Sequence, residues 1–326
     1  MKTIAITMGD AAGVGPEIIA GAWNQLQTIP DCRIVVYGHP EIMQRATRLR
    51  QTNTEIDCEP CCSDDVLGVL PGTIDSRSGY AAYQSILRAI DDAQKNTVDA
   101  IVTAPIHKAA LHLAGCRYPG HTEIFAAQCG IENYAMMLYI GPGENLGGPY
   151  GLAVVHVTLH TPMKTVFEQI TIESVLAKIQ LADGFMRQIM GQHNRQPCIG
   201  VCSLNPHAGE EGLFGDEEIR IIRPAIERAA AAGLHVEGPK PADTIILDAR
   251  DGKYDALVAM FHDQGHIALK LLGMYRAVNV TLGLPIVRTS VAHGTAFDKA
   301  WQGVADTGSL LEAVRVASHL ASTSVN

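Results

Sequence analysis

The sequence predicts an α/β fold, a mostly parallel sheet with helices on both faces, arranged in two lobes. Short apolar runs that are hydrophobic on both faces alternate with amphipathic helical segments, and this alternation is typical of covered parallel sheets. The chain has 326 residues, which is enough for one large unit or two lobes. Its content of 47% hydrophobic and 18% charged residues indicates a well-buried core.

Six apolar runs are the strand candidates, and helical patterns lie between them. The runs are residues 4–7, 34–37, 100–103, 152–157, 198–204 and 256–260. Pro16, with Glu17 beside it, suits the first turn of a helix. Two longer helices are expected over residues 79–95 and 172–190, where apolar residues recur at helical spacing. The segment 141–149 is rich in glycine and proline, so we expect a mobile surface loop rather than a linker between domains.

Composition limits the possible partners and the compartment. A formal net charge of −9 argues against nucleic acid or an anionic membrane as the main partner. We expect no signal peptide and no membrane span, because Met1 and Lys2 lead at once into a strand-like run. Eight cysteines are too few for a disulfide scaffold of this size. Cys58 and Cys61 form a single CxxC motif, and without a second such motif it indicates a metal-free loop. A reducing cytoplasm is therefore expected.

Three histidines, His160, His207 and His262, each follow one of the predicted strands. Neutral imidazoles at strand ends can converge on one divalent cation. Spacings of 47 and 55 residues are far too long for a zinc finger, so any shared site is made by the fold, which favours a catalytic metal. The alternative is that each histidine separately caps a strand or packs in a loop.

The first loop, residues 8–17, links a predicted strand to the start of a helix. Its glycines expose backbone N–H groups, and such a turn suits a phosphate or a carboxylate. The loop matches neither the Rossmann fingerprint nor the Walker motif. A tight turn without a ligand is the alternative.

Six short motifs extend over nearly the whole chain. In order they are TAPIHK (103–108), YPGHTE (118–123), NPHAGE (205–210), HDQG (262–265), VNVTLGLP with RTS (278–285 and 288–290) and HGTA (293–296). Together they resemble the 4-hydroxythreonine-4-phosphate dehydrogenase family. His156 and His266 make the chain most similar to the branch of D-threonate and D-erythronate 4-phosphate dehydrogenases, although both could also be core histidines or supports of the metal ligands.

The resemblance implies a metal held by His160, His207 and His262, with one of the three contributed by the second subunit of a homodimer. The substrate contacts that it implies are His121, Thr122, Lys270, Asn279 and Arg288, and its acidic neighbours are Asp243 and Asp263. Lys270 and Arg288 would supply the positive charge that a phosphorylated acid needs. The proton acceptor stays open among Asp243, Asp263, Lys270 and a bound water.

The segment 293–298 is similar to the adenosine-side loop of the isocitrate and isopropylmalate dehydrogenases, and this implies NAD bound without a GxGxxG motif. The cofactor residues so implied are Gly13, His293, Gly294, Thr295, Ala296 and Asp298. Residues 1–120 with 271–326 would form the cofactor lobe, and 121–270 the metal, substrate and dimerisation lobe. Ala11 and Ala292 depart from the residues common in the family at those positions, which could loosen cofactor binding.

We therefore expect NAD-dependent oxidation, with decarboxylation, of a four-carbon 3-hydroxy acid 4-phosphate such as D-threonate or D-erythronate 4-phosphate. The metal could be zinc, cobalt, magnesium or manganese. The nearest alternative is 4-hydroxythreonine-4-phosphate, the substrate in pyridoxal phosphate biosynthesis. A metal-dependent aldolase or hydrolase and a non-catalytic sensor of sugar-acid phosphates are the alternatives from other classes. A branch acting on aromatic cis-dihydrodiols lacks the counterparts of Asn279 and Arg288, which this chain keeps.

Overall fold

The computed structural model describes residues 1–52, 54–192 and 195–323, and the chain divides into two compact units. The first unit comprises Met1–Glu132 and Leu284–Asn326, and the second comprises Asn133–Gly283. The lobe boundaries at 120 and 270, and the roles assigned to the two lobes, stay predictions. Within the part of the chain that the structure describes, no helix is both long and apolar enough to cross a membrane.

The first unit contains a parallel sheet in the order β3-β2-β1-β4-β11. Its strands are β1 (Lys2–Thr7), β2 (Cys32–Gly38), β3 (Cys58–Pro60), β4 (Ala100–Thr103) and β11 (Val287–Val291). Its helices are α1 (Gly15–Leu26), α2 (Pro40–Arg50), the short η1 (Asp64–Gly68), α3 (Ser76–Gln94), α4 (Lys108–Leu113), α5 (His121–Cys129) and α11 (Gly308–Thr323). The predicted helix at Pro16 is α1, and the predicted helix over 79–95 is α3.

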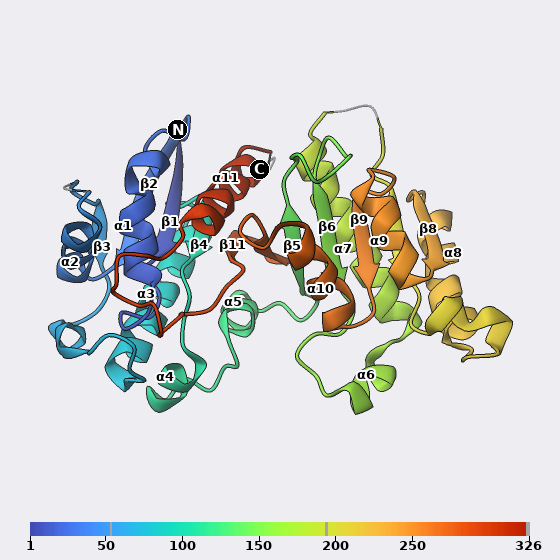
Figure 1. The fold of residues 1–326 in the computed structure, drawn as a ribbon, viewed down its shortest axis with the longest axis horizontal. Helices are drawn as coiled ribbons and strands as arrows, with labels where there is room; N and C mark the ends of the chain where they lie inside the picture. The colour runs from blue at the N-terminus through green and yellow to red at the C-terminus, as the bar shows by residue number, and fades with distance from the viewer. Residues whose placement is uncertain (53, 193–194, 324–326) are drawn as a thin grey trace. The chain divides into compact units, whose positions relative to one another are not determined.

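Helices pack on the sheet of the first unit (Figure 1), and its core lies on both faces of this sheet. Ala5 is in register with Val35 on β2 and with Ile101 on β4, and these side chains share one hydrophobic cluster with Ile86 and Ile90 of α3. Side chains alternate along a strand, so the neighbours of Ala5 face the opposite side, where α11 packs. Apolar residues on both faces therefore reflect helices on both faces.

The second unit contains a mixed sheet in the order β10-β5-β6-β9-β7-β8, in which β5 is antiparallel to both its neighbours and the remaining pairs are parallel. Its strands are β5 (Ala135–Ile140), β6 (Leu152–His156), β7 (Ile199–Cys202), β8 (Val236–Lys240), β9 (Ala256–Ala259) and β10 (Val278–Leu282). Its helices are α6 (Met163–Gln169), α7 (Ile172–Met190), η2 (Pro206–Gly212), η3 (Glu218–Ile222), α8 (Arg223–Ala231), α9 (Ala242–Arg250) and α10 (His262–Gly273). In Figure 1, α7 and α8 cover one face of this sheet, and α9 and α10 cover the other.

The α/β class with a mostly parallel sheet is confirmed, whereas some strand ends differ from the prediction. The run 198–204 forms a strand only as far as Cys202, because the backbone N–H groups of Leu204 and Asn205 donate to the carboxylate of Glu218, at 2.7 and 2.8 Å. The run 152–157 ends as a strand at His156. The segment 141–149 connects β5 and β6 of one sheet, so it is no linker between domains.

Gly265 is required by the close approach of α10 to β6. A Cβ atom at this position would lie 2.5 Å from Nε2 of His156 and 2.6 Å from Cγ1 of Val154. We expect Gly265→Ala to lower the free energy of unfolding by about 1–3 kcal/mol in urea titrations, as overpacking does. The matched control is Gly184→Ala in α7, where the added Cβ meets nothing within 4 Å and should stabilise the helix by about 0.5–1 kcal/mol. A change in the free energy of unfolding that has the same sign in both variants would contradict this account.

Candidate active site

Each of the three predicted metal ligands follows a strand that ends at the same edge of the second unit's sheet. Strands β6, β9 and β7 are adjacent and parallel, so their carboxyl ends meet at the same edge. His160 follows β6, His262 begins α10 directly after β9, and His207 follows β7. Gln264 ties two of these loops together, because its side chain accepts from the Met260 N–H at 2.7 Å and donates to the Ser203 carbonyl at 2.8 Å.

His262 is held on both sides of its ring. Its Nδ1 atom lies 2.6 Å from Oδ1 of Asp263, and its ring stacks on His266 with centroids 3.8 Å apart. The carboxylate can only accept, so Nδ1 carries the proton and Nε2 is left as the nitrogen that can bind a metal. A carboxylate behind a ligating imidazole is the usual support of metal-binding histidines. The ring of His160 lies 5.8 Å from that of His262, so the structure brings these two together.

His207 lies on the neighbouring loop, where it faces Phe214 with ring centroids 6.4 Å apart. Among the described residues of one chain, the one group of three possible metal donors is Cys198, His235 and Glu237, not the three predicted histidines. One chain thus offers an exposed imidazole, His160, and a half-buried one, His262, as two possible ligands of a divalent metal. This arrangement suits a site to which a second subunit contributes.

Behind His262 lies a buried pair of neutral histidines, His156 and His266. Nδ1 of His266 is 3.1 Å from Nε2 of His156, and the two residues are 7% and 2% exposed, respectively. Burial lowers the pKa of His156 to about 3 and that of His266 to about 4, and each neighbouring imidazole adds to the effect. Both rings are therefore uncharged at neutral pH, and His266 stacks directly on His262.

In the first unit Arg288 is a buried cation beside Thr103, Phe125 and His121. It is 2% exposed, donates to Oγ1 of Thr103 at 2.7 Å, and lies over the ring of Phe125 at 5.5 Å from its centroid. Burial lowers the pKa of Arg288 to about 9, so the guanidinium stays charged at neutral pH at a cost that an anion would offset. Burial and the charge of Arg288 hold the pKa of His121 well below its usual value, so this imidazole is neutral.

The predicted cofactor residues Gly13 and Thr295 lie against each other. A Cβ atom on Gly13 would be 3.0 Å from Cβ of Thr295, and the Val14 N–H donates to the Thr295 carbonyl at 3.0 Å. The next loop residue, Ala296, has a φ of 42°, and Phe297 stacks on His107 with ring centroids 4.7 Å apart.

Asp10 is fully buried, and His107, which is half-buried in the same unit, acts on it electrostatically to lower the pKa of its carboxyl group. Oδ1 of Asp10 accepts from Ser78 and from the Ala12 N–H, and burial raises the pKa of this carboxyl group. Within the described ranges, Oδ2 of Asp10 and Nδ1 of His107 are buried without a hydrogen-bond partner. Buried atoms without a hydrogen-bond partner are uncommon in proteins and mark a place where a polar ligand, an ion or water can bind.

The remaining predicted residues lie on both units. Thr122 is buried in the first turn of α5. Asn279 is on β10, and its Oδ1 atom is buried without a partner in the described part of the chain. Lys270 is two turns after His262 on α10 and is close enough to lower the pKa of His266. Asp243 is exposed in the first turn of α9, directly after β8.

Sequence reasoning gave no role to Thr103, Asp10 or Gln264. The first two end or follow buried strands, and polar residues at strand ends were the available signal. Gln264 lies inside the HDQG motif, but its bonds to two different loops depend on the order of the strands. No local sequence pattern indicates these two bonds of Gln264.

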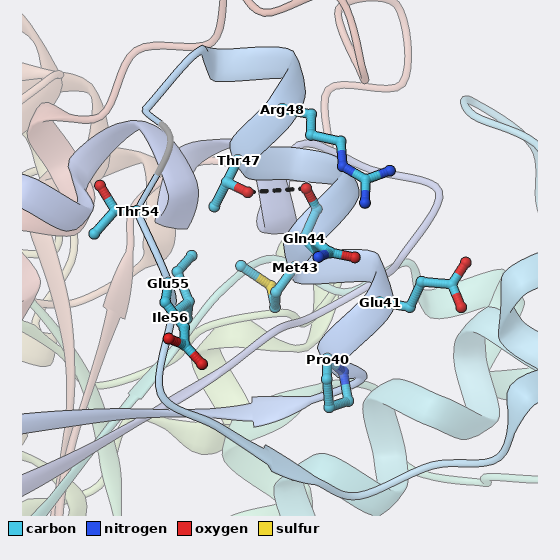
Figure 2. A pocket seen from close by; sticks show the side chains of 9 residues that line it. All are labelled: Pro40, Glu41, Met43, Gln44, Thr47, Arg48, Thr54, Glu55 and Ile56. Atoms are coloured by element: carbon cyan, nitrogen blue, oxygen red, sulfur yellow. Dashed lines mark hydrogen bonds between the residues drawn. The ribbon is translucent and has the colours of Figure 1, made fainter.

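A hollow beside α2 is unrelated to these residues (Figure 2). It is lined by Pro40, Glu41, Met43, Gln44, Thr47, Arg48, Thr54, Glu55 and Ile56. Figure 2 shows Thr47 turned back onto its own helix, where its hydroxyl donates to the Gln44 carbonyl at 2.9 Å. None of the predicted metal, substrate or cofactor residues lines it, so it is not a candidate active site.

Comparison with known proteins identifies the family of this chain. The family model described as pyridoxal phosphate biosynthetic protein PdxA matches residues 30–317. The chain belongs to the PdxA family. D-threonate 4-phosphate dehydrogenase of Salmonella typhimurium is 42% identical, over 98% of this chain and 99% of the relative. 4-Hydroxythreonine-4-phosphate dehydrogenase of Beijerinckia indica is 44% identical, over 97% of this chain and 94% of the relative.

Solved structures confirm the fold of this PdxA family member. A 4-hydroxythreonine-4-phosphate dehydrogenase from Klebsiella pneumoniae is 41% identical and superposes with a TM-score of 0.82, covering 98% of this chain and 100% of that one. A β-decarboxylating dehydrogenase from Thermococcus kodakarensis shares the fold at 16% identity, with a TM-score of 0.51 over 98% and 84% of the two chains. The predicted fold class is therefore confirmed, and the fold is shared with a β-decarboxylating dehydrogenase.

Proposed function

We propose that this PdxA family member oxidises a four-carbon 3-hydroxy acid 4-phosphate, of the D-threonate or D-erythronate type, with NAD, and that the oxidised acid loses carbon dioxide. The observation that carries the proposal is the buried Arg288, with Thr103 and a neutral His121 beside it. A buried guanidinium offers a paired set of donors to a phosphate, and the anion offsets the cost of burying the charge.

His160, His207 and His262 would hold a divalent metal, which supplies a Lewis acid that acidifies the substrate hydroxyl and stabilises the negative charge left by decarboxylation. Gly13 and residues 293–298 would hold NAD, the acceptor of the hydride. In this scheme Asp263 and the His156–His266 pair orient His262. Lys270, as an ammonium ion, would attract the carboxylate of the substrate. The hydroxyl proton would then go to Asp243 or to a water, because Asp263 is bound to His262.

The 4-hydroxythreonine-4-phosphate alternative rests on relatives of both names at nearly equal identity, 42% and 44%. A panel of four-carbon acid 4-phosphates, with hydroxythreonine phosphate and an aromatic cis-dihydrodiol, assayed with NAD and NADP, separates the candidates. We expect the highest kcat/KM for threonate or erythronate 4-phosphate, measured as NADH absorbance. A preference for the dihydrodiol, or equal rates with unphosphorylated acids, would overturn the proposal. Substrate cleavage or tight binding without NADH formation would favour an aldolase or a sensor.

Sharing of the site between two subunits has its own test. Because His160 and His262 lie together in one chain, we propose that His207 comes from the other subunit. Subunit exchange between inactive His207→Ala and inactive His262→Ala proteins then creates one intact site in each mixed dimer, and about a quarter of wild-type activity should return. The matched control is a mixture of His160→Ala and His262→Ala, which restores nothing. Equal recovery in both mixtures would contradict the sharing.

A further inference from the structure

A second set of possible metal donors lies at the other end of the parallel strands of the second unit, where β7 and β8 begin. Cys198 directly precedes β7, and His235 directly precedes β8. The register pairs Ile199 with Val236, so Cys198 and His235 lie side by side. Side chains alternate along a strand, which places Glu237 on the same face as His235. Strand pairing therefore presents a thiol, an imidazole and a carboxylate on one face.

The distances fit a single small cation. Sγ of Cys198 is 3.9 Å from Nε2 of His235, and one donor atom from each of the three residues lies within 4.8 Å of the others. In a tetrahedral zinc site, with Zn–S of about 2.3 Å and Zn–N of about 2.0 Å, sulfur and nitrogen are about 3.5 Å apart. Small side-chain shifts are enough to close this difference. Thiolate and imidazole together favour zinc over magnesium or calcium.

Neighbouring groups already hold two of the donors in place. Oε2 of Glu237 accepts from the Tyr254 hydroxyl at 2.8 Å and from Nζ of Lys240 at 3.1 Å, which leaves Oε1 to face a cation. The Cys198 N–H donates to Asp255 at 2.8 Å. Such bonds behind the ligands are typical of metal sites. The charge of Lys240 opposes a cation, so we expect weaker binding than in a closed site of four protein ligands.

Nucleophilic chemistry does not suit this thiol. Burial, together with the nearby carboxylates of Glu237 and Asp255, raises the pKa of Cys198 to about 11, so the sulfur is protonated at neutral pH. A bound cation would displace that proton to solvent and stabilise the thiolate. His235 is exposed, so a fourth ligand can come from water.

We propose that Cys198, His235 and Glu237 bind one zinc ion, with water as the fourth ligand. The ion would tie β8, the last strand of its sheet in the second unit, to β7. This site is separate from the histidines at the carboxyl ends of the strands, and it does not depend on the dehydrogenase activity.

Cobalt binding tests the site, because a thiolate bound to Co²⁺ gives a near-ultraviolet charge-transfer band that a site of histidines alone cannot give. Chelator-treated protein is titrated with Co²⁺. We expect the band to saturate when about one equivalent of Co²⁺ per chain has bound in addition to any Co²⁺ bound by His160, His207 and His262. It should disappear in Cys198→Ser and persist in Cys202→Ser, a buried thiol at the end of the same strand. It should also persist in His262→Ala.

His235→Ala provides a second variant, and because the side chain is exposed the fold should tolerate the change. Its cobalt affinity should fall at least about tenfold. A wild-type titration without the band would overturn the proposal. So would a band that survives in Cys198→Ser, which would assign it to other thiols such as Cys58, Cys61 and Cys62. Loss of dehydrogenase activity in any variant has no bearing on either result.

Discussion

Turnover is expected to fall by about 10³-fold or more when His262 is replaced by alanine, because a metal acting as a Lewis acid supplies several kcal/mol of transition-state stabilisation. His262 is supported by Asp263 at Nδ1 and by His266, which stacks on its ring. The His262→Ala protein should also contain less metal than the wild type, measured by elemental analysis after gel filtration. Its thermal midpoint should change little, since catalytic metals contribute less to folding than structural ones.

His112→Ala is the control for this experiment, because His112 is an exposed histidine in the last turn of α4. It should keep both activity and metal. The activity and metal content of Asp263→Asn should lie between those of His112→Ala and His262→Ala. Its metal affinity should be about 10–100-fold weaker than that of the wild type, because the carboxylate orients the imidazole without being a ligand. Full activity of wild-type protein stripped of metal would refute the metal role of His262.

The Michaelis constant for a four-carbon acid 4-phosphate is expected to rise about 30-fold to several thousand-fold in Arg288→Ala, equivalent to about 2–5 kcal/mol. The physical reason is the burial of the guanidinium between Phe125 and Thr103, where water cannot replace it as a partner for phosphate. Steady-state kinetics with phosphorylated and unphosphorylated forms of the same acid measures the effect. The unphosphorylated acid should be used about equally well by variant and wild type.

Arg288→Lys separates charge from geometry. It keeps a cation but loses the planar fork that grips two phosphate oxygens, so its Michaelis constant should be intermediate. Circular dichroism and thermal unfolding check that the fold is kept, because a large buried side chain is removed in Arg288→Ala. Equal loss of activity toward the phosphorylated and unphosphorylated acids would mean that Arg288 supports the fold and not the phosphate.

Some elements could be predicted from local pattern and others could not. Strands β1, β2, β4, β6 and β9 are short apolar runs bounded by turns, and their existence follows from that pattern. The run that forms β5, Ala135–Ile140, is as apolar but contains two methionines and a leucine, which favour a buried helix equally. Strand β8 carries a proline and two charged residues, and β3 has three residues, so neither shows a strand pattern.

The sequence by itself determined that His160, His207 and His262 each follow a strand and that the motifs belong to one family, because these properties are local or ordered along the chain. Only the tertiary structure decided that β6, β9 and β7 are neighbours, which brings His160 and His262 to 5.8 Å, and that Phe125 covers Arg288. The order of strands depends on packing between segments distant in sequence. The lowered pKa values of His156, His266 and Arg288 arise from burial, and burial exists only once those distant segments have come together.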